Sequence, residues 1–145
     1  MKQELVKVWM TRNVLTADPG TTLPEAHQLM MKHKIRRLPV VEKNGRLLGI
    51  VTLGDVRGAQ PSQATSLSVW EMNYLLAKLK LKEIMTADPV TIDPEATIGE
   101  AARLMLENKV SGLPVVDDEH KVIGVITESD IFSMVVLHEW EEVYA

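Results

Sequence analysis

Apolar and polar positions follow the same order twice along this chain. A proline directly follows each of the segments Thr16–Asp18 and Val90–Asp93. Because a residue before proline avoids the helical region, both segments are predicted to be short and extended. Apolar residues then recur at helical spacing over Leu23–Met30 and Ile98–Met105. A Thr-x-x-Glu capping box stands at the start of each run, and it predicts where each helix begins.

Two strands and a further helix follow in each half. The runs Leu38–Val41 and Leu113–Val116 predict buried strands, and Leu47–Val51 and Val122–Ile126 predict the strands that return beside them. Asn44-Gly45 predicts a hairpin turn in the first half, where the second half has Glu119-His120. Asp55 and Asp130 then each start a helix. The predicted order of elements is β-α-β-β-α in both halves.

A direct comparison shows that the halves are repeats. When Val6–Val56 is laid over Leu81–Ile131 at a constant offset of 75, 19 of 51 positions are identical without a gap. Chance would give about 3 identities, so a unit of about 50 residues is duplicated. We therefore expect repeat 1 at residues 1–57, a connector loop and helix at 58–80, repeat 2 at 81–133 and a helical tail at 134–145.

These elements predict an α/β (α+β) fold. A three-stranded sheet in a unit of this size leaves one face uncovered, so we expect the two repeats to pack face to face with pseudo-twofold symmetry. A second capping box, Ser68 and Glu71, predicts the connector helix, and Ile131–Tyr144 has helical spacing. Apolar positions on the connector and the tail either pack back on their own module or form the surface of a homodimer, which we favour.

Composition and charge exclude several classes of protein. The net charge is −4 and the basic residues are scattered, which argues against a nucleic-acid partner or an anionic membrane surface. The longest apolar run, Met134–Leu137, is far below the roughly 20 residues of a membrane helix, and no signal-peptide core is present. The chain has no cysteine, which excludes disulfides and thiolate chemistry. We expect a cytoplasmic protein.

Catalytic and metal-binding patterns are also missing from the sequence. It has no glycine-rich Walker loop, no nucleophile elbow and no paired His and Cys, so we expect no enzyme and no catalytic residues. The spacing of the histidines does not fit a metal site; they are His27, His33, His120 and His138. We therefore expect neither a metal nor a required cofactor.

The ordered motifs carry a resemblance to a known family. Met-Thr, a threonine strand, Leu-Pro-Val-Val and then Gly-h-h-Thr-x-x-Asp resemble the cystathionine-β-synthase (CBS) domain, and both Gly49–Asp55 and Gly124–Asp130 fit the last motif. The resemblance implies a CBS pair, or Bateman module, that senses AMP, ADP, ATP, NAD or S-adenosylmethionine. The connector also resembles stand-alone bacterial CBS proteins, including the acetoin-utilisation type.

The residue chemistry supports a nucleoside ligand. One carboxylate, Asp55 or Asp130, can accept from both hydroxyls of a ribose, and the hydroxyls of Thr52 and Thr127 can donate to phosphate. The start of the following helix offers free N–H groups to an anion. A structural alternative stays open, since aspartate is also a favoured helix cap.

Resemblance to the γ subunit of AMP-activated kinase implies two sites, each combining both repeats. The first site would join Thr127 and Asp130 to Leu15, Thr16, Ile35, Arg36 and Arg37. The second site would join Thr52 and Asp55 to Val90, Thr91, Val110, Ser111 and Gly112. Within these sets, Leu15 and Val90 would contact the adenine through their backbone, and Ile35 and Val110 would cover the ring.

The two sites are expected to differ in ligand. A guanidinium suits phosphate, so the site with Arg36 and Arg37 should prefer the more highly phosphorylated nucleotide, unless the two arginines only form a solvated face. The expected function is regulatory binding of an adenine nucleotide, with an effector protein reached in trans. The alternative is a structural dimerisation module with degenerate ligand sites.

Overall fold

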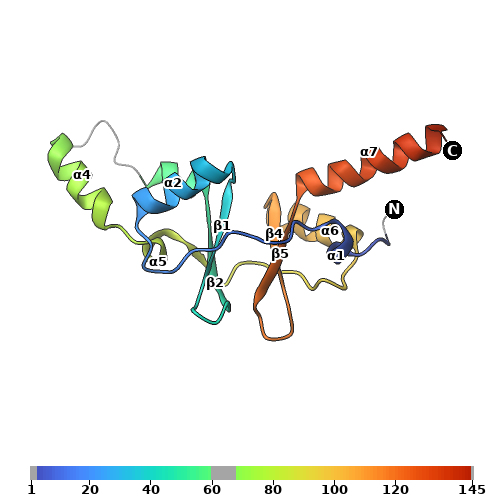
Figure 1. The fold of residues 1–145 in the computed structure, drawn as a ribbon, viewed down its shortest axis with the longest axis horizontal. Helices are drawn as coiled ribbons and strands as arrows, with labels where there is room; N and C mark the ends of the chain where they lie inside the picture. Colours follow the sequence, from blue (N-terminus) through green and yellow to red (C-terminus); the bar gives the residue numbers. More distant parts are fainter. Residues whose placement is uncertain (1–2, 60–67, 145) are drawn as a thin grey trace. The chain divides into compact units, whose positions relative to one another are not determined.

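The chain forms two compact units, each with its own core. The structure is a computed structural model that describes residues 3–59 and 68–144, with the backbone alone described for residue 69 and residues 140–144. The first-repeat unit is Leu15–Pro89, and the second-repeat unit joins Met1–Val14 to Val90–Ala145 (Figure 1). Most of the predicted connector loop, residues 60–67, lies outside the described residues.

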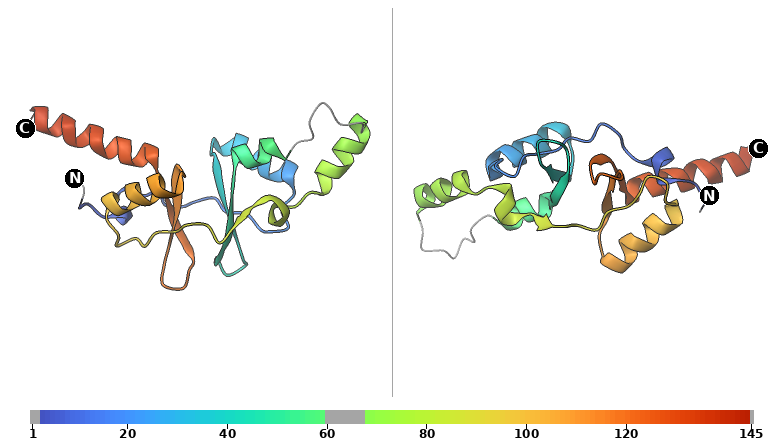
Figure 2. Two further views of the ribbon diagram at one scale, coloured as in Figure 1. Left: turned by 180° about the vertical axis from the view of Figure 1, so that it is seen from behind. Right: turned by 90° about the horizontal axis from the view of Figure 1, so that it is seen from below.

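The first-repeat unit is built on an antiparallel hairpin. Strands β1 (Arg37–Val41) and β2 (Leu47–Thr52) pair through Leu38 and Val51, and the short strand β3 (Thr86–Ala87) pairs with the other edge of β2 (Figure 2). The helices of this unit are α2 (Leu23–His33), α3 (Leu53–Gly58), α4 (Val69–Lys78) and α5 (Leu81–Ile84). The strand expected at residues 16–18 is reduced to one parallel bridge between Ala17 and Val40.

The second-repeat unit has a similar plan, but its sheet has two strands, and an isolated bridge between Thr11 and Val125 takes the place of β3. Strands β4 (Gly112–Val116) and β5 (Val122–Thr127) form its antiparallel hairpin, and Ile92 makes a single parallel bridge to Val115. Its helices are α1 (Val6–Trp9), α6 (Ile98–Asn108) and α7 (Glu128–Tyr144). Helix α7 runs without a break through residue 134, so the expected repeat boundary at 133 falls inside a helix. Of the predicted apolar positions of the tail, the side chains of Trp140 and Val143 lie outside the described residues.

The two units exchange their first segments. The N–H of Val6 donates to the carbonyl of Ala96 (2.8 Å) and that of Thr11 donates to Val125 (2.9 Å), so the start of the chain completes the second-repeat unit. The equivalent segment 75 residues later completes the first-repeat unit. There the N–H of Leu81 donates to the carbonyl of Thr21 (2.9 Å). The chain therefore passes from one unit to the other at Val14/Leu15 and Pro89/Val90, nine residues after the aligned repeats begin at Val6 and Leu81.

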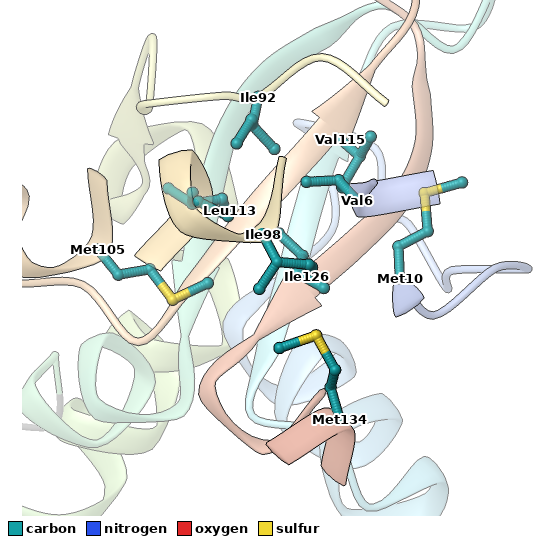
Figure 3. Packing of buried hydrophobic residues seen from close by; sticks show 10 residues of the cluster. Val6, Met10, Ile92, Ile98, Met105, Leu113, Val115, Ile126 and Met134 are labelled. Atoms are coloured by element: carbon teal, nitrogen blue, oxygen red, sulfur yellow. The ribbon is translucent and has the colours of Figure 1, made fainter. Parts of the chain in front are cut away.

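Each unit buries apolar side chains from both exchanged and local segments. In the second-repeat unit, Ile98 and Ile126 lie close together within one cluster, which also contains Met10 and Met134 (Figure 3). The corresponding cluster of the first-repeat unit contains Met30, Leu38, Val51 and Leu81. Burial of these side chains supplies most of the stabilisation, at about 25 cal/mol per Å² of apolar area.

The predicted capping boxes are confirmed at both long local helices. Thr22 Oγ1 accepts from the N–H of Glu25 (3.4 Å), and Thr97 Oγ1 accepts from the N–H of Glu100 (3.1 Å). The connector helix begins as predicted, because Ser68 Oγ accepts from the N–H of Glu71 (3.2 Å). Within the described part of the chain, no helix is long and apolar enough to cross a bilayer, and no group of acidic or histidine side chains is placed to hold a metal ion.

Candidate ligand-binding site

The Thr-x-x-Asp motif forms the turn between the hairpin and the next helix. In the first-repeat unit the N–H of Thr52 donates to Asp55 Oδ2 (2.9 Å), and the N–H of Asp55 donates to Thr52 Oγ1 (3.0 Å). The helix begins at Leu53, so Thr52 is its N-cap and Asp55 is its third residue. The expectation that Asp55 starts the helix is thus wrong by two residues, because the threonine takes the cap and the aspartate closes the box.

The second-repeat unit repeats this geometry. The N–H of Thr127 donates to Asp130 Oδ2 (2.9 Å), and the N–H of Asp130 donates to Thr127 Oγ1 (3.3 Å). The Thr127 hydroxyl also donates to Asp130 Oδ2 (3.1 Å). Helix α7 begins at Glu128, so the helix starts two residues before Asp130, where it was expected to begin. The structural role of both aspartates is therefore real.

Capping occupies only one oxygen of each carboxylate. The hydrogen bonds to Asp55 and Asp130 from the turn end on Oδ2, and among residues 3–59 and 68–144 no hydrogen bond to either Oδ1 is present. Both aspartates are half-buried. The turn therefore fixes the position of each carboxylate while leaving Oδ1 as an acceptor.

The segment before each first strand lies against the turn of its own repeat. The N–H of Leu53 donates to the carbonyl of Arg36 (2.8 Å), and the N–H of Glu128 donates to the carbonyl of Ser111 (3.0 Å). In the hairpins, Arg37 is paired with Thr52 and Gly112 is paired with Thr127. These backbone contacts place the predicted phosphate and ribose residues of one repeat at one end of its hairpin.

The extended segments reach the same end. Ala17 donates to the carbonyl of Pro39 (2.9 Å) and accepts from the N–H of Val41 (2.9 Å), as in a parallel pair. Because the segment runs parallel to β1, Leu15 and Thr16 lie toward the start of β1, where Thr52 is found. Ile92 makes the equivalent bonds to Pro114 and Val116, at 3.0 and 3.1 Å, so Val90 and Thr91 occupy the matching positions.

The structure thus gathers the candidate residues repeat by repeat. The first-repeat unit brings together Leu15, Thr16, Ile35, Arg36, Arg37, Thr52 and Asp55. The second-repeat unit brings together Val90, Thr91, Val110, Ser111, Gly112, Thr127 and Asp130. The expected sites combine the Thr-x-x-Asp turn of one repeat with the extended segment and the residues before the first strand of the other repeat. That combination stays a prediction. The expectation of free N–H groups at the start of the following helix is wrong for Leu53 and Glu128, because their N–H groups donate to the carbonyls of Arg36 and Ser111. These two contacts were missed by the sequence reasoning, and their only signal is the place of both residues directly after the capping threonine.

The two clusters differ in charge and in exposure. Arg36 is exposed and Arg37 is half-buried, whereas their counterparts Ser111 and Gly112 are half-buried and buried. Ile35 packs against the core of its unit, and Val110 is 38% exposed. The first cluster therefore carries two arginines at these positions, and the second offers no cation there.

Comparison with known sequences finds the CBS domain at residues 4–62 and 81–137. A CBS domain-containing protein of Dictyostelium discoideum is 36% identical over 132 residues, which are 91% of this chain and 91% of that protein. The inosine-5'-monophosphate dehydrogenase of Korarchaeum cryptofilum is 36% identical over 124 residues, which are 86% of this chain but 23% of the enzyme. The chain thus spans less than a quarter of that enzyme.

Solved structures with the same fold include complexes with adenosine compounds. A Vibrio cholerae protein named after acetoin utilization (AcuB) has a TM-score of 0.78 and 34% identity, and the match covers 95% of each chain. CBSX2 of Arabidopsis thaliana, solved with AMP, has a TM-score of 0.78 and 28% identity over 94% of this chain and 98% of its own. The CBS domain pair of protein MJ0100, solved with 5'-methylthioadenosine and S-adenosyl-L-methionine, has a TM-score of 0.75 and 30% identity over 90% of this chain and 94% of its own.

Proposed function

The chain belongs to the CBS domain family, and from this premise we propose that it is a regulatory module that binds an adenine nucleotide and acts on a partner protein in trans. The proposal includes a homodimer, a cytoplasmic location and no catalysis by the chain itself. The relation to the Korarchaeum enzyme supports the last point, because the shared region is a minor part of that enzyme.

The observation that carries the proposal is the acceptor left at each Thr-x-x-Asp turn. Asp55 and Asp130 are each held through Oδ2, which leaves Oδ1 for a ribose hydroxyl. A carboxylate that is already fixed loses little conformational entropy when a ligand binds. Repetition of this arrangement in both units supports two binding positions rather than one.

The ligand class follows from the same residues. AMP in CBSX2 and S-adenosyl-L-methionine in the MJ0100 pair support an adenosine compound as the ligand here. Arg36 and Arg37 add positive charge to one cluster only, which favours ATP or ADP at the site that includes them and AMP or an uncharged adenosine compound at the other. Neither ligand would be a cofactor, since no reaction is proposed.

Regulation would follow from differential affinity. A ligand shifts a conformational equilibrium only when it binds one state more tightly than the other. In this proposal two elements respond to the ligand: the connector at Gly58–Gln63 and helix α7 from Ile131 onward. Residues 60–63 of the connector lie outside the described residues. Helix α7 carries Asp130 in its first turn and continues to Tyr144, so a ligand at one end can bias the whole helix.

The test is isothermal titration with AMP, ADP, ATP, NAD and S-adenosylmethionine. The variants Asp55→Asn and Asp130→Asn keep a side-chain oxygen for the cap but remove the negative charge that a ribose would meet. Matched controls are Glu25→Gln and Glu100→Gln, which alter the same type of capping box outside the candidate site. Each aspartate variant should lose one class of binding position, and the glutamate variants should bind normally.

A second function has its own supporting observation. Helix α7 exposes Phe132 (63%), Val136 (61%) and Leu137 (50%), as a surface for dimerisation would. If the folded protein binds none of the five ligands yet is dimeric, a structural dimerisation module with degenerate sites replaces the sensor.

A further inference from the structure

The connector helix α4 has two faces, and only one of them is used inside the first-repeat unit. Leu76 and Leu79 pack against the core of that unit, and the carbonyl of Leu79 accepts from the N–H of Leu23 (2.8 Å). In Figure 1, α4 lies beside α2 and apart from the β1–β2 hairpin of the same unit. The helix is therefore anchored along one side, with the opposite side directed to solvent.

The outer face of α4 is apolar. Trp70 is 85% exposed, Tyr74 is 60% exposed and Leu75 is 54% exposed. Together with Glu71 they line a shallow open hollow on the helix surface. Large aromatic side chains that gather on one solvent-exposed face are typical of a protein interface.

The charges on this face are arranged for self-pairing. Glu71 and Lys78 are seven residues apart, so they lie on nearly the same line along the helix, about 10.5 Å apart. Tyr74 and Leu75 lie midway between them. Lys78 Nζ is 4.1 Å from the centre of the Tyr74 ring and hydrogen-bonds the Tyr74 hydroxyl, which holds the ammonium group on the patch. One end of the patch is thus negative and the other is positive.

A second copy in the antiparallel direction complements this pattern. A twofold axis between Tyr74 and Leu75 sets Glu71 of each protomer opposite Lys78 of its partner, because both residues are equally far from the axis along the helix. A parallel arrangement would instead set Glu71 against Glu71 and Lys78 against Lys78. In the antiparallel pair Trp70 would cover the partner's end of the patch, and the aromatic and aliphatic side chains would be removed from water at the centre.

We infer that two copies of this chain associate through an antiparallel pair of α4 helices, the patch being Trp70, Glu71, Tyr74, Leu75 and Lys78. The inference rests on the proposed homodimer and names its surface. A single helix pair is smaller than a standard interface of about 1,600 Å², so the association is expected to be weak and dependent on protein concentration.

Charge reversal tests both the surface and its direction. Glu71→Lys and Lys78→Glu each place like charges at both Glu71–Lys78 contacts, so each variant alone should dimerise about tenfold more weakly by analytical ultracentrifugation. An equimolar mixture of the two variants should recover wild-type association, because one protomer then carries two positive charges at these positions and its partner carries two negative charges. Lys43→Glu, in the exposed β1–β2 turn, is the matched control and should behave as wild type.

Cysteine cross-linking gives a second readout that does not depend on charge. The chain has no cysteine, so a single introduced thiol is unique. Leu75→Cys, next to the proposed axis, should form a covalent dimer on mild oxidation, and a mixture of Glu71→Cys with Lys78→Cys should cross-link faster than either protein alone. Lys43→Cys should remain monomeric under the same conditions.

Several outcomes would overturn the inference. Unchanged dimerisation of both charge variants would mean that another surface, such as α7, joins the copies. A monomeric wild type at all concentrations would mean that another part of the chain or a different protein covers the patch. AMP titration of the same samples separates this inference from the proposed function. If the protein binds AMP but its α4 helices do not pair, the inference about α4 is overturned and the proposed function is not.

Discussion

Nε2 of His138 lies 2.8 Å from Oε1 of Glu4, and this contact joins residues 134 positions apart. The other carboxylate oxygen of Glu4 accepts from Nε1 of Trp9 (2.8 Å), and the rings of Trp9 and His138 are 6.2 Å apart between centroids. Glu4 thus ties the exchanged first segment to α7 within the second-repeat unit. Its side chain is 31% exposed, so solvent screens the contact only in part.

The first prediction is that Glu4→Ala destabilises the protein by about 1–2 kcal/mol, because two part-buried donors lose their acceptor together. Glu95→Ala is the control, since its contact with Lys7 (2.7 Å) ties down the same segment but is well exposed, and it should cost less than about 0.5 kcal/mol. Urea denaturation of both variants measures the difference. Equal losses would show that Glu4 has no special part in holding the segment.

The second prediction concerns two glycines at equivalent positions. A Cβ on Gly124 would lie 2.6 Å from Met10 Sδ and 2.9 Å from the carbonyl oxygen of Thr11, and one on Gly49 would lie 2.7 Å from that of Thr86. Each exchanged segment passes directly over a glycine, so Gly49→Ala and Gly124→Ala should each cost about 1–3 kcal/mol. Gly58→Ala has no atom within 4 Å of its Cβ and should be neutral or slightly stabilising.

Thermal unfolding of the three alanine variants tests this comparison. A loss of stability in Gly58→Ala equal to that in Gly124→Ala would show that the effect comes from the backbone alone. Normal stability of Gly49→Ala and Gly124→Ala would mean that the exchanged segments do not pack as closely as the structure shows.

Local signals in the sequence predicted the elements that have local causes. The helices after Thr22 and Thr97 begin where the capping boxes place them, because both partners of each box are three residues apart. The exchanged segments were not predicted as part of the other unit. The four-residue helices α1 and α5 are too short for a periodic pattern, and the partners that hold them, such as Ala96 for Val6, are distant in the chain.

The candidate site also has a part with local causes, which the sequence predicted, and a part that depends on distant contacts, which it did not. Thr52 and Asp55 could be identified because their hydrogen bonds span three residues, and the family resemblance marked them as well. The bond from Leu53 N–H to the carbonyl of Arg36 spans 17 residues and leaves no mark on either side chain. That contact depends on the β1–β2 register, which becomes visible only when the hairpin is formed.

The third prediction addresses the charge difference between the clusters. The double variant Arg36→Ser with Arg37→Gly gives the first repeat the residues that the second has at 111 and 112. It should lower ATP affinity about tenfold or more while AMP affinity falls less, because the arginines are proposed to meet the outer phosphates. Titration with both nucleotides, at low and raised salt, measures the ratio. Equal losses for AMP and ATP would place the arginines away from the phosphates.

The last prediction follows helix α7 from the site to its far end. Asp130 lies in its first turn and His138 contacts Glu4 two turns later, so a ligand held by Asp130 should slow amide exchange in both turns of this single helix. Hydrogen exchange with and without a saturating ligand measures the effect, and helix α6 of the same unit is the internal reference. Protection should disappear in Asp130→Asn but persist in Glu100→Gln. Exchange that is unchanged along α7, in a protein shown to bind the ligand, would rule out this helix as the element that transmits the signal.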